Sequence, residues 1–342
     1  MPWSASVAAT VAQVAACASG PQHVAVLAER GIGRQRVRTA VGAGALTVLR
    51  RGIVVPTDAW RTAEIADRRR WAVEAALLAF PAGCASHDSA ARLHGLPEFR
   101  MHADDADAIP STHITRVGAA RVDDWLTVHG CDTPPEWIHT AGGLRMTDLV
   151  RTSIETAAGR SLRGALVVID AAMRLAAAEH AGSSAVRAAV IDPAVVGALR
   201  VRWRYAVGAY AGHRWVTTVR QAVELADPAA ESVLESLSRA AMIENAVPQP
   251  RCGVPLVGDD GRTYWVDFCW DRFGLIGEAD GLAKYDDPSA HLREKHRQEA
   301  LRARGWEFVR WGFAHVFPDP TVMLSRVRHA LRQPPTRLGW LP

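Results

Sequence analysis

Apolar residues recur at helical spacing through most of the first forty positions of the chain. The periodic stretches predict three short helices, which cover residues 5–18, 23–30 and 33–42. In the third stretch Val37 and Val41 stand four residues apart, so both side chains are expected to face the core. Arg34 and Arg38 share the same spacing on another face, which we expect to point into solvent.

The pattern changes from helical to extended after the third predicted helix. Two short β-rich runs cover residues 46–49 and 53–55, and Arg50 and Arg51 lie between them. This arrangement is typical of a tight hairpin with arginines at its tip. Three helices followed by a hairpin predict a winged helix-turn-helix over residues 1–57.

The exposed polar residues of this predicted domain suit contact with DNA. Arg34, Gln35 and Arg38 are placed to reach base edges or phosphates, and Arg50 and Arg51 to hold the backbone or the minor groove. The alternative is that these are ordinary solvated side chains, because an arginine-rich chain places Arg on most exposed helices.

The middle of the chain, residues 58–226, has mostly helical periodicity. Strand-like alternation interrupts it around residues 113–117 and 125–128, and further helices are predicted to end near residues 158 and 178. We therefore predict a mostly helical connecting domain. Three neighbouring residues of this segment, Cys84, His87 and His94, fit no zinc-binding spacing, so a metal site formed by them is not favoured.

The last part of the chain, residues 227–335, predicts a mixed sheet flanked by helices. A helix is followed by a three-stranded meander, a charged helix, a strand and a closing helix. These elements cover residues 229–244, 254–257, 263–270, 275–279, 289–304, 306–311 and 322–331. The whole chain is thus expected to be a multidomain protein of the α+β or α/β class.

Length and composition agree with several folded domains. The chain has 342 residues and 49% hydrophobic residues, which is too long for one small domain and sufficient to form cores. It contains no long uncharged apolar stretch and no basic residues ahead of its Ala-rich start, so it is expected neither to span a membrane nor to be exported. Five scattered cysteines without a CxxC pair fit a cytoplasmic location.

Charge is unevenly distributed along the sequence. Residues 1–60 carry six Arg against two acids, residues 227–287 carry twelve acids against five bases, and residues 293–342 carry ten bases against four acids. Of the 40 basic residues 38 are Arg, and the two lysines, Lys284 and Lys295, lie close together in sequence. The acidic segment and both lysines lie in the last predicted domain, which is therefore the candidate for a functional site.

Two acids of the predicted meander lie in apolar strands, where burial of a charged side chain is energetically unfavourable. Asp267 lies between Val266 and Phe268 in an apolar run, and Glu278 ends the next strand. A buried carboxylate needs a cationic partner or a metal ion, and two carboxylates joined by a hairpin suit Mg²⁺. Such an ion would activate water and offset charge on a scissile phosphate. The alternative is a pair of solvated acids flanking a turn.

The same residues resemble a known family. The runs Val266-Asp267-Phe268 and Glu278-Ala279-Asp280-Gly281, with the charged segment from Arg293 to Glu299, resemble the very-short-patch-repair-endonuclease-like branch of the PD-(D/E)XK superfamily. The resemblance implies a restriction-endonuclease-like fold over about residues 229–317.

The resemblance also implies roles for individual residues. It makes Asp267 and Glu278, with Asp280, ligands of Mg²⁺ or Mn²⁺, and Glu235 the acidic residue of the first helix. The usual E-x-K tripeptide is Glu278-Ala279-Asp280 here, so its lysine is absent. Lys284 or Lys295 would take its place in assisting the attacking water, or the site has lost catalysis. Arg293 and Arg297 of the charged helix would hold the phosphate backbone.

The first two thirds of the chain resemble actinobacterial proteins that carry an AbiEi-like antitoxin region. The matching segments are the predicted winged helix, residues 84–95 and residues 146–152. The resemblance implies a type IV antitoxin or transcriptional regulator. Our leading hypothesis is therefore a DNA-binding protein with a metal-dependent endonuclease-like domain. The alternative is a non-enzymatic regulator with a degenerate nuclease fold; a cognate toxin and a homodimer are possible partners.

Overall fold

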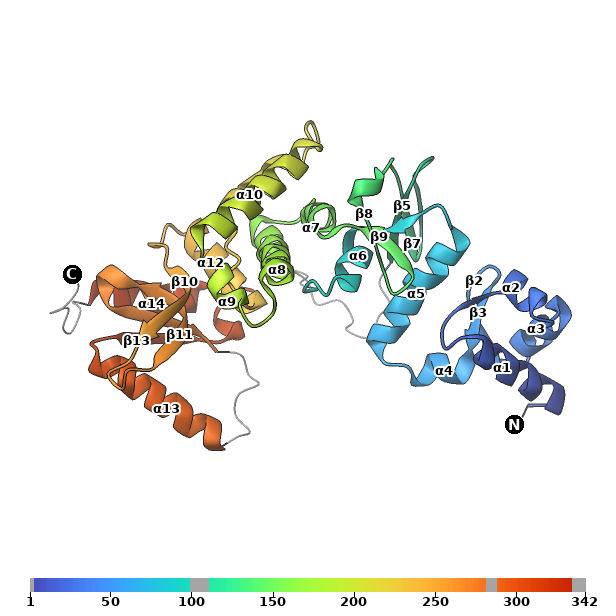
Figure 1. Ribbon diagram of the computed structural model, residues 1–342, viewed down its shortest axis with the longest axis horizontal. Coiled ribbons are helices and arrows are strands. Elements are labelled where there is room, and N and C mark those ends of the chain that lie inside the picture. Colours follow the sequence, from blue (N-terminus) through green and yellow to red (C-terminus); the bar gives the residue numbers. More distant parts are fainter. Residues whose placement is uncertain (1–2, 99–110, 281–287, 334–342) are drawn as a thin grey trace. The chain divides into compact units, whose positions relative to one another are not determined.

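The computed structural model describes residues 3–98, 111–280 and 288–333 (Figure 1). Its described residues form a mixed α and β protein, as predicted, with three separate sheets. The chain forms two compact units, and the change from the first to the second follows Glu155. The predicted boundaries after residues 57 and 226 fall inside these units, so the three-domain division stays a prediction. Within the described residues, no helix is both long and apolar enough to cross a membrane.

The first unit begins with three helices and a small sheet. The helices are α1 (Ala5–Cys17), α2 (Val24–Glu29) and α3 (Arg34–Gly42), and the strands are β1 (Gln22–His23), β2 (Leu46–Arg50) and β3 (Ile53–Pro56). The sheet is antiparallel in the order β1-β3-β2. Val14, Leu27 and Val37 pack together between the helices. The predicted helices and hairpin are confirmed, whereas the two-residue strand β1 was not predicted.

The rest of the first unit contains a six-stranded sheet; the two predicted strand-like runs, at residues 113–117 and 125–128, are two of its strands, and the other four were not predicted. The strands are β4 (Cys84–Ala85), β5 (Thr112–Arg116), β6 (Arg121–Asp123), β7 (Leu126–Gly130), β8 (Ile138–Ala141) and β9 (Leu144–Thr147). They lie in the order β6-β7-β5-β4-β9-β8. The edge strands β6 and β8 are largely exposed, so they lack the apolar alternation that identifies a strand in sequence. The helices of this part are α4 (Thr57–Thr62), α5 (Ile65–Ala79) and α6 (His87–Leu93).

Helices dominate the first part of the second unit. They are α8 (Leu162–Ala181), α9 (Val186–Ala189), α10 (Pro193–Gly208) and α11 (Val216–Leu225), and α7 (Leu149–Ala157) precedes them. Asp170 of α8 is fully buried and pairs with Arg239, whose Nη2 lies 3.2 Å from Asp170 Oδ1. Ser236 also donates a hydrogen bond to this carboxylate, at 2.9 Å. Burial raises the pKa of Asp170, and the guanidinium opposes that rise.

The last part of the second unit has the predicted order of elements. They are α12 (Val233–Glu244), β10 (Arg251–Val257), β11 (Thr263–Trp270), β12 (Leu275–Ala279), α13 (Pro288–Ala303), β13 (Glu307–Trp311) and α14 (Thr321–Arg332). The sheet order is β10-β11-β12-β13, with β13 parallel to β12 and the other pairs antiparallel. One apolar layer joins the sheet to α12 and α14, and a second joins it to α13.

Candidate functional sites

The two predicted metal-binding acids lie where the pairing of β11 with β12 ends. Phe268 and Gly277 are the last paired residues at this end, and Asp267 and Glu278 are their immediate neighbours in sequence. Asp267 Oδ2 accepts a hydrogen bond of 2.8 Å from the backbone N–H of Ala279, which fixes this carboxylate beside the end of β12.

Glu278 is a buried carboxylate with an arginine partner. Its side chain is 7% exposed, and Oε1 accepts a hydrogen bond of 2.6 Å from Arg297 Nη2 of α13. Burial raises the pKa of Glu278 to about 8; Arg297 opposes the rise, and the charge of Asp267 adds to it. Arg297 was predicted to hold phosphates, but its guanidinium turns inward, because the buried carboxylate requires a counter-ion. Arg293, one helical turn earlier, is exposed.

Glu235 has a structural role at the start of α12 as well as a place near the acid pair. Ser232 caps the helix by accepting a bond from Glu235 N–H, and Glu235 accepts bonds from Ser232 Oγ and from the N–H of Glu231. Burial raises the pKa of Glu235 to about 7, and the charge of Asp267 adds to the rise. The carboxylate is therefore close enough to Asp267 for their charges to interact.

The remaining residues of the predicted catalytic set lie elsewhere or have other partners. Asp280 accepts a hydrogen bond of 3.5 Å from Arg310, and a second nitrogen of Arg310 donates to Glu294. Lys295 is 70% exposed on α13 and lies 3.8 Å from Glu299. The cation that meets Glu278 is thus Arg297, whereas assistance from Lys295 was predicted. Lys284 lies outside the described residues.

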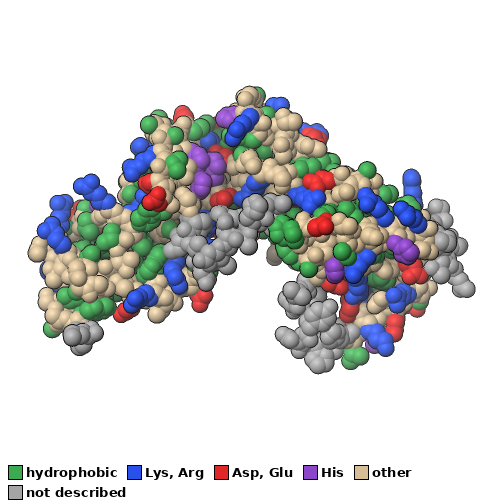
Figure 2. Space-filling view, turned by 180° about the vertical axis from the view of Figure 1, so that it is seen from behind, with side chains coloured by type: hydrophobic (Ala, Val, Ile, Leu, Met, Phe, Trp, Pro, Cys, Tyr) green, Lys and Arg blue, Asp and Glu red, His purple; other side chains and the backbone are tan. Residues whose placement is uncertain are grey.

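The predicted DNA-contacting side chains of α3 are exposed. Gly33 precedes the helix, and Arg34, Gln35 and Arg38 lie in its first turns with their side chains in solvent. Arg38 donates a hydrogen bond of 3.4 Å to Gln35, so the two form one polar group. Figure 2 shows that, on the face it presents, basic side chains are interspersed with acidic and apolar ones.

The two arginines of the β2–β3 hairpin differ from each other. Arg51 is exposed at the turn, as predicted. The guanidinium of Arg50 instead lies 5.1 Å from the ring centre of Trp125, next to β7, and burial lowers its pKa. Arg50 therefore packs within the first unit, because an aromatic face offers a favourable contact to a guanidinium.

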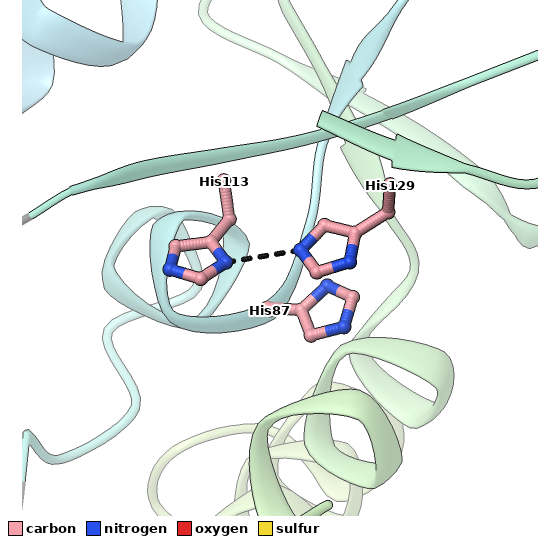
Figure 3. Close-up of side chains that lie close together, drawn as sticks. All are labelled: His87, His113 and His129. Carbon is pink, nitrogen blue, oxygen red and sulfur yellow. Dashed lines mark hydrogen bonds between the residues drawn. The ribbon is translucent and has the colours of Figure 1, made fainter. Parts of the chain in front are cut away.

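Three histidines of the first unit form a cluster that the sequence did not reveal. Each of His87, His113 and His129 offers a ring nitrogen within 4.8 Å of the others (Figure 3). His113 Nδ1 lies 3.0 Å from His129 Nε2, and the rings of His87 and His129 stack with centres 3.7 Å apart. Among the described residues this is the one group of three possible metal ligands at such distances.

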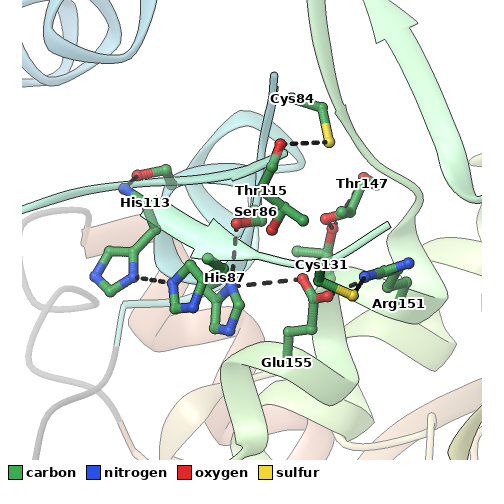
Figure 4. A network of polar contacts seen from close by, with 12 residues as sticks. Cys84, Ser86, His87, His113, Thr115, Cys131, Thr147, Arg151 and Glu155 are labelled. Carbon is green, nitrogen blue, oxygen red and sulfur yellow. Dashed lines mark hydrogen bonds and ion pairs between the residues drawn. The ribbon is translucent and has the colours of Figure 1, made fainter. Parts of the chain in front are cut away.

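Polar residues surround the histidine cluster (Figure 4). His87 Nδ1 lies 3.1 Å from Ser86 Oγ and 3.5 Å from Glu155 Oε2. Arg151 donates a hydrogen bond of 2.7 Å to the other oxygen of Glu155. Burial holds the pKa of His87 well below its usual range and lowers that of His129 to about 4.

Sequence spacing gave no signal for this cluster. Along the chain, the neighbours of His87 that could bind a metal are Cys84 and His94. His94 is instead bound to the backbone oxygen of Thr147, at 2.8 Å. The partners of His87 are 26 and 42 residues further along, and only the pairing of β5 with β7 brings them together.

Comparisons with known proteins identify relatives but no activity. Two proteins of Mycobacterium tuberculosis, from two strains and both named as uncharacterized, are 32% identical to this chain over 125 residues. The match covers 36% of this chain and 46% of each relative, so the chain spans about half the length of the curated relatives it matches. No family model and no solved structure match the chain.

Proposed function

We propose that this chain binds DNA through its N-terminal helices and hairpin, in the manner of a winged helix-turn-helix. The order of helices and strands from α1 to β3 supports the proposal. The observation that carries it is the exposed basic start of α3, where Arg34, Gln35 and Arg38 lie together. In such domains the first residues of the recognition helix contact base edges in the major groove.

Loss of the α3 arginines tests DNA binding. Arg34→Ala and Arg38→Ala should each weaken the association of the full chain with duplex DNA, and each should reduce the salt dependence of binding by a slope of about 1, because each removes one phosphate contact. Gel shifts at several salt concentrations measure both effects. Arg61→Ala, an exposed arginine on α4, is the matched control. Equal affinities for all four proteins would contradict a DNA-binding role for α3.

The proposal for the second unit is an endonuclease-like domain in which Asp267 and Glu278 hold Mg²⁺. The charge of Asp267 acts on both Glu278 and Glu235, and the pKa values of these two acids are raised. A divalent cation would offset this clustered negative charge, and Mg²⁺ often takes only one or two protein carboxylates. When bound, the ion would activate water and stabilise charge on a phosphate. Arg297 orients Glu278, and Ala279 N–H orients Asp267.

Metal-dependent nicking of plasmid DNA tests this part of the proposal. The full chain with Mg²⁺ or Mn²⁺ should nick the plasmid, and Asp267→Ala and Glu278→Ala should each reduce the rate by at least about 100-fold while gel-shift binding persists. Glu299→Ala, an exposed acid of α13, should keep the wild-type rate. Nicking that survives both substitutions would reject these two acids as the site.

A specific observation favours a second candidate function, a non-enzymatic regulator or antitoxin. The lysine expected two residues after Glu278 is Asp280, which pairs with Arg310, and Glu278 itself pairs with Arg297. Ion pairs of this kind can replace a metal in neutralising buried acids. DNA binding without nicking in either metal would favour this candidate, with a cognate toxin as its partner.

A further inference from the structure

The histidine cluster of the first unit is built by elements that are distant in sequence. His87 begins α6, His113 lies in β5 and His129 lies in β7. In the parallel pair of β5 and β7, His113 is opposite Thr127 and Thr115 is opposite His129. Because side chains alternate along a strand, both histidines lie on the same face of the sheet, where α6 supplies the third.

The geometry of the cluster suits a metal ion. The three rings are half-buried, and each offers one ring nitrogen within 4.8 Å of the other two. Two tetrahedral ligands with metal–nitrogen bonds of about 2.0–2.1 Å lie roughly 3.3 Å apart. The 3.0 Å between His113 Nδ1 and His129 Nε2 is close to this separation, so a small opening would admit an ion.

We propose that His87, His113 and His129 bind one divalent transition-metal ion of the zinc class. Three imidazoles are a ligand set that Zn²⁺ uses, and they leave a fourth coordination position for water or a substrate. His87 completes the set by turning out of its stack on His129. The ligand chemistry differs from that of the acid pair in β11 and β12, where oxygen atoms alone are offered, so the two sites take different ions.

Glu155 acts in this site as a positioning residue. Its Oε2 lies 3.5 Å from His87 Nδ1, and Arg151 holds its other oxygen at 2.7 Å. A carboxylate beside a metal-binding imidazole fixes the ring and adds negative charge to offset that of the ion. The proximity of Arg151 makes this charge important, because its guanidinium alone would repel a cation.

The backbone of His87 also indicates how the site can be tested without unfolding the protein. His87 has a φ of 50°, a left-handed conformation that non-glycine residues rarely adopt. Asparagine is among the residues that tolerate it best. His87→Asn therefore removes the imidazole while keeping the start of α6.

Zinc binding to the full chain tests the proposal. After removal of metals with EDTA and dialysis, calorimetric titration with Zn²⁺ should give one site per chain at pH 7.5. His87→Asn and His113→Phe should each weaken binding by at least about 100-fold, and Glu155→Gln by about 10- to 100-fold. His139→Asn is the matched control, because His139 is an exposed histidine of the same sheet. It should bind Zn²⁺ as the wild type does.

Co²⁺ provides a second measurement that does not depend on the variants. The wild-type chain loaded with Co²⁺ should show the visible absorption of a four-coordinate site with nitrogen ligands and without thiolate charge-transfer bands. No Zn²⁺ uptake by the wild type, equal affinity in all five proteins, or a thiolate spectrum would each overturn the proposal. The plasmid assay uses Mg²⁺ or Mn²⁺, so failure here leaves the proposed nuclease site standing, and the reverse also holds.

Discussion

Gly277 occupies a point in β12 where a side chain has no room. A Cβ atom there would lie 2.8 Å from the ring of Trp311 and 2.9 Å from that of Trp270, and both rings are buried. Phe268, opposite Gly277, would also be only 3.2 Å away. The residue next to Glu278 is thus fixed by packing on the opposite face of the sheet.

We expect Gly277→Ala to destabilise the second unit by about 1–3 kcal/mol, because overpacking forces the aromatic rings to shift. Urea unfolding followed by tryptophan fluorescence measures the change. Gly197→Ala in α10 is the control: nothing lies within 4 Å of its Cβ position, so it should be neutral or stabilising by up to about 1 kcal/mol. An equal effect of the two substitutions would be inconsistent with the packing described.

The proximity of the two acids in the second unit could be expected from the sequence, but the side chains that contact them could not. Asp267 and Glu278 could be predicted because both lie in short strands joined by a turn, and a hairpin brings its strands together whatever else the fold does. Arg297 could not, since its contact depends on how α13 packs on the sheet. The rarity of lysine drew attention to Lys295, but an exposed helix face explains that residue.

The buried carboxyl group of Glu235, at the start of α12, makes the stability of the second unit depend on pH. The raised pKa of Glu235 means that the folded state holds a proton up to about pH 7, whereas the unfolded chain releases it near 4.5. The stability of the second unit should therefore fall as the pH rises from about 4.5 to 7.

Glu235→Gln isolates this effect, because glutamine also suits the third position of a capped helix. At pH 8 the variant should exceed the wild type in unfolding free energy by about 3 kcal/mol, and at pH 4.5 the two should agree to within about 0.5 kcal/mol. Urea titrations at both pH values measure the difference. Glu299→Gln, at an exposed acid of α13, should leave the pH dependence intact. Parallel pH profiles for wild type and Glu235→Gln would refute the assignment.

Whole elements were predicted where their apolar pattern was strong. The bounds of β11 and β12 agree with prediction, because burial imposes a run of apolar residues on them. The edge strands β6 and β8 were missed, because their exposed side chains follow no such pattern; Val122 of β6 is 77% exposed. The histidine cluster was missed for a related reason. It depends on strand pairing, which spacing along the chain does not encode.

The uneven charge of the chain gives a prediction for the molecule as a whole. DNA binding by the full chain should depend on exposed arginines at both ends of the sequence and not on those already paired with buried acids. Arg293→Ala should lower the salt slope of DNA binding by about 1. Arg297→Gln should not change it, because Glu278 already occupies that guanidinium. A lowered slope for Arg297→Gln would show that Arg297 leaves Glu278 when DNA binds, and an unchanged slope for Arg293→Ala would contradict the DNA contact of Arg293.

The ion pair between Asp170 and Arg239 determines which fragments of the second unit are expected to be stable. A fragment that starts at residue 227 would keep every strand of the last sheet, yet it would lack α8 and with it the counter-ion of Arg239. Removing one partner of a buried pair costs about 3–5 kcal/mol, which is a large share of the stability of a small domain. Attempts to express the last sheet alone should accordingly retain α8, even though the family resemblance begins some fifty residues after it.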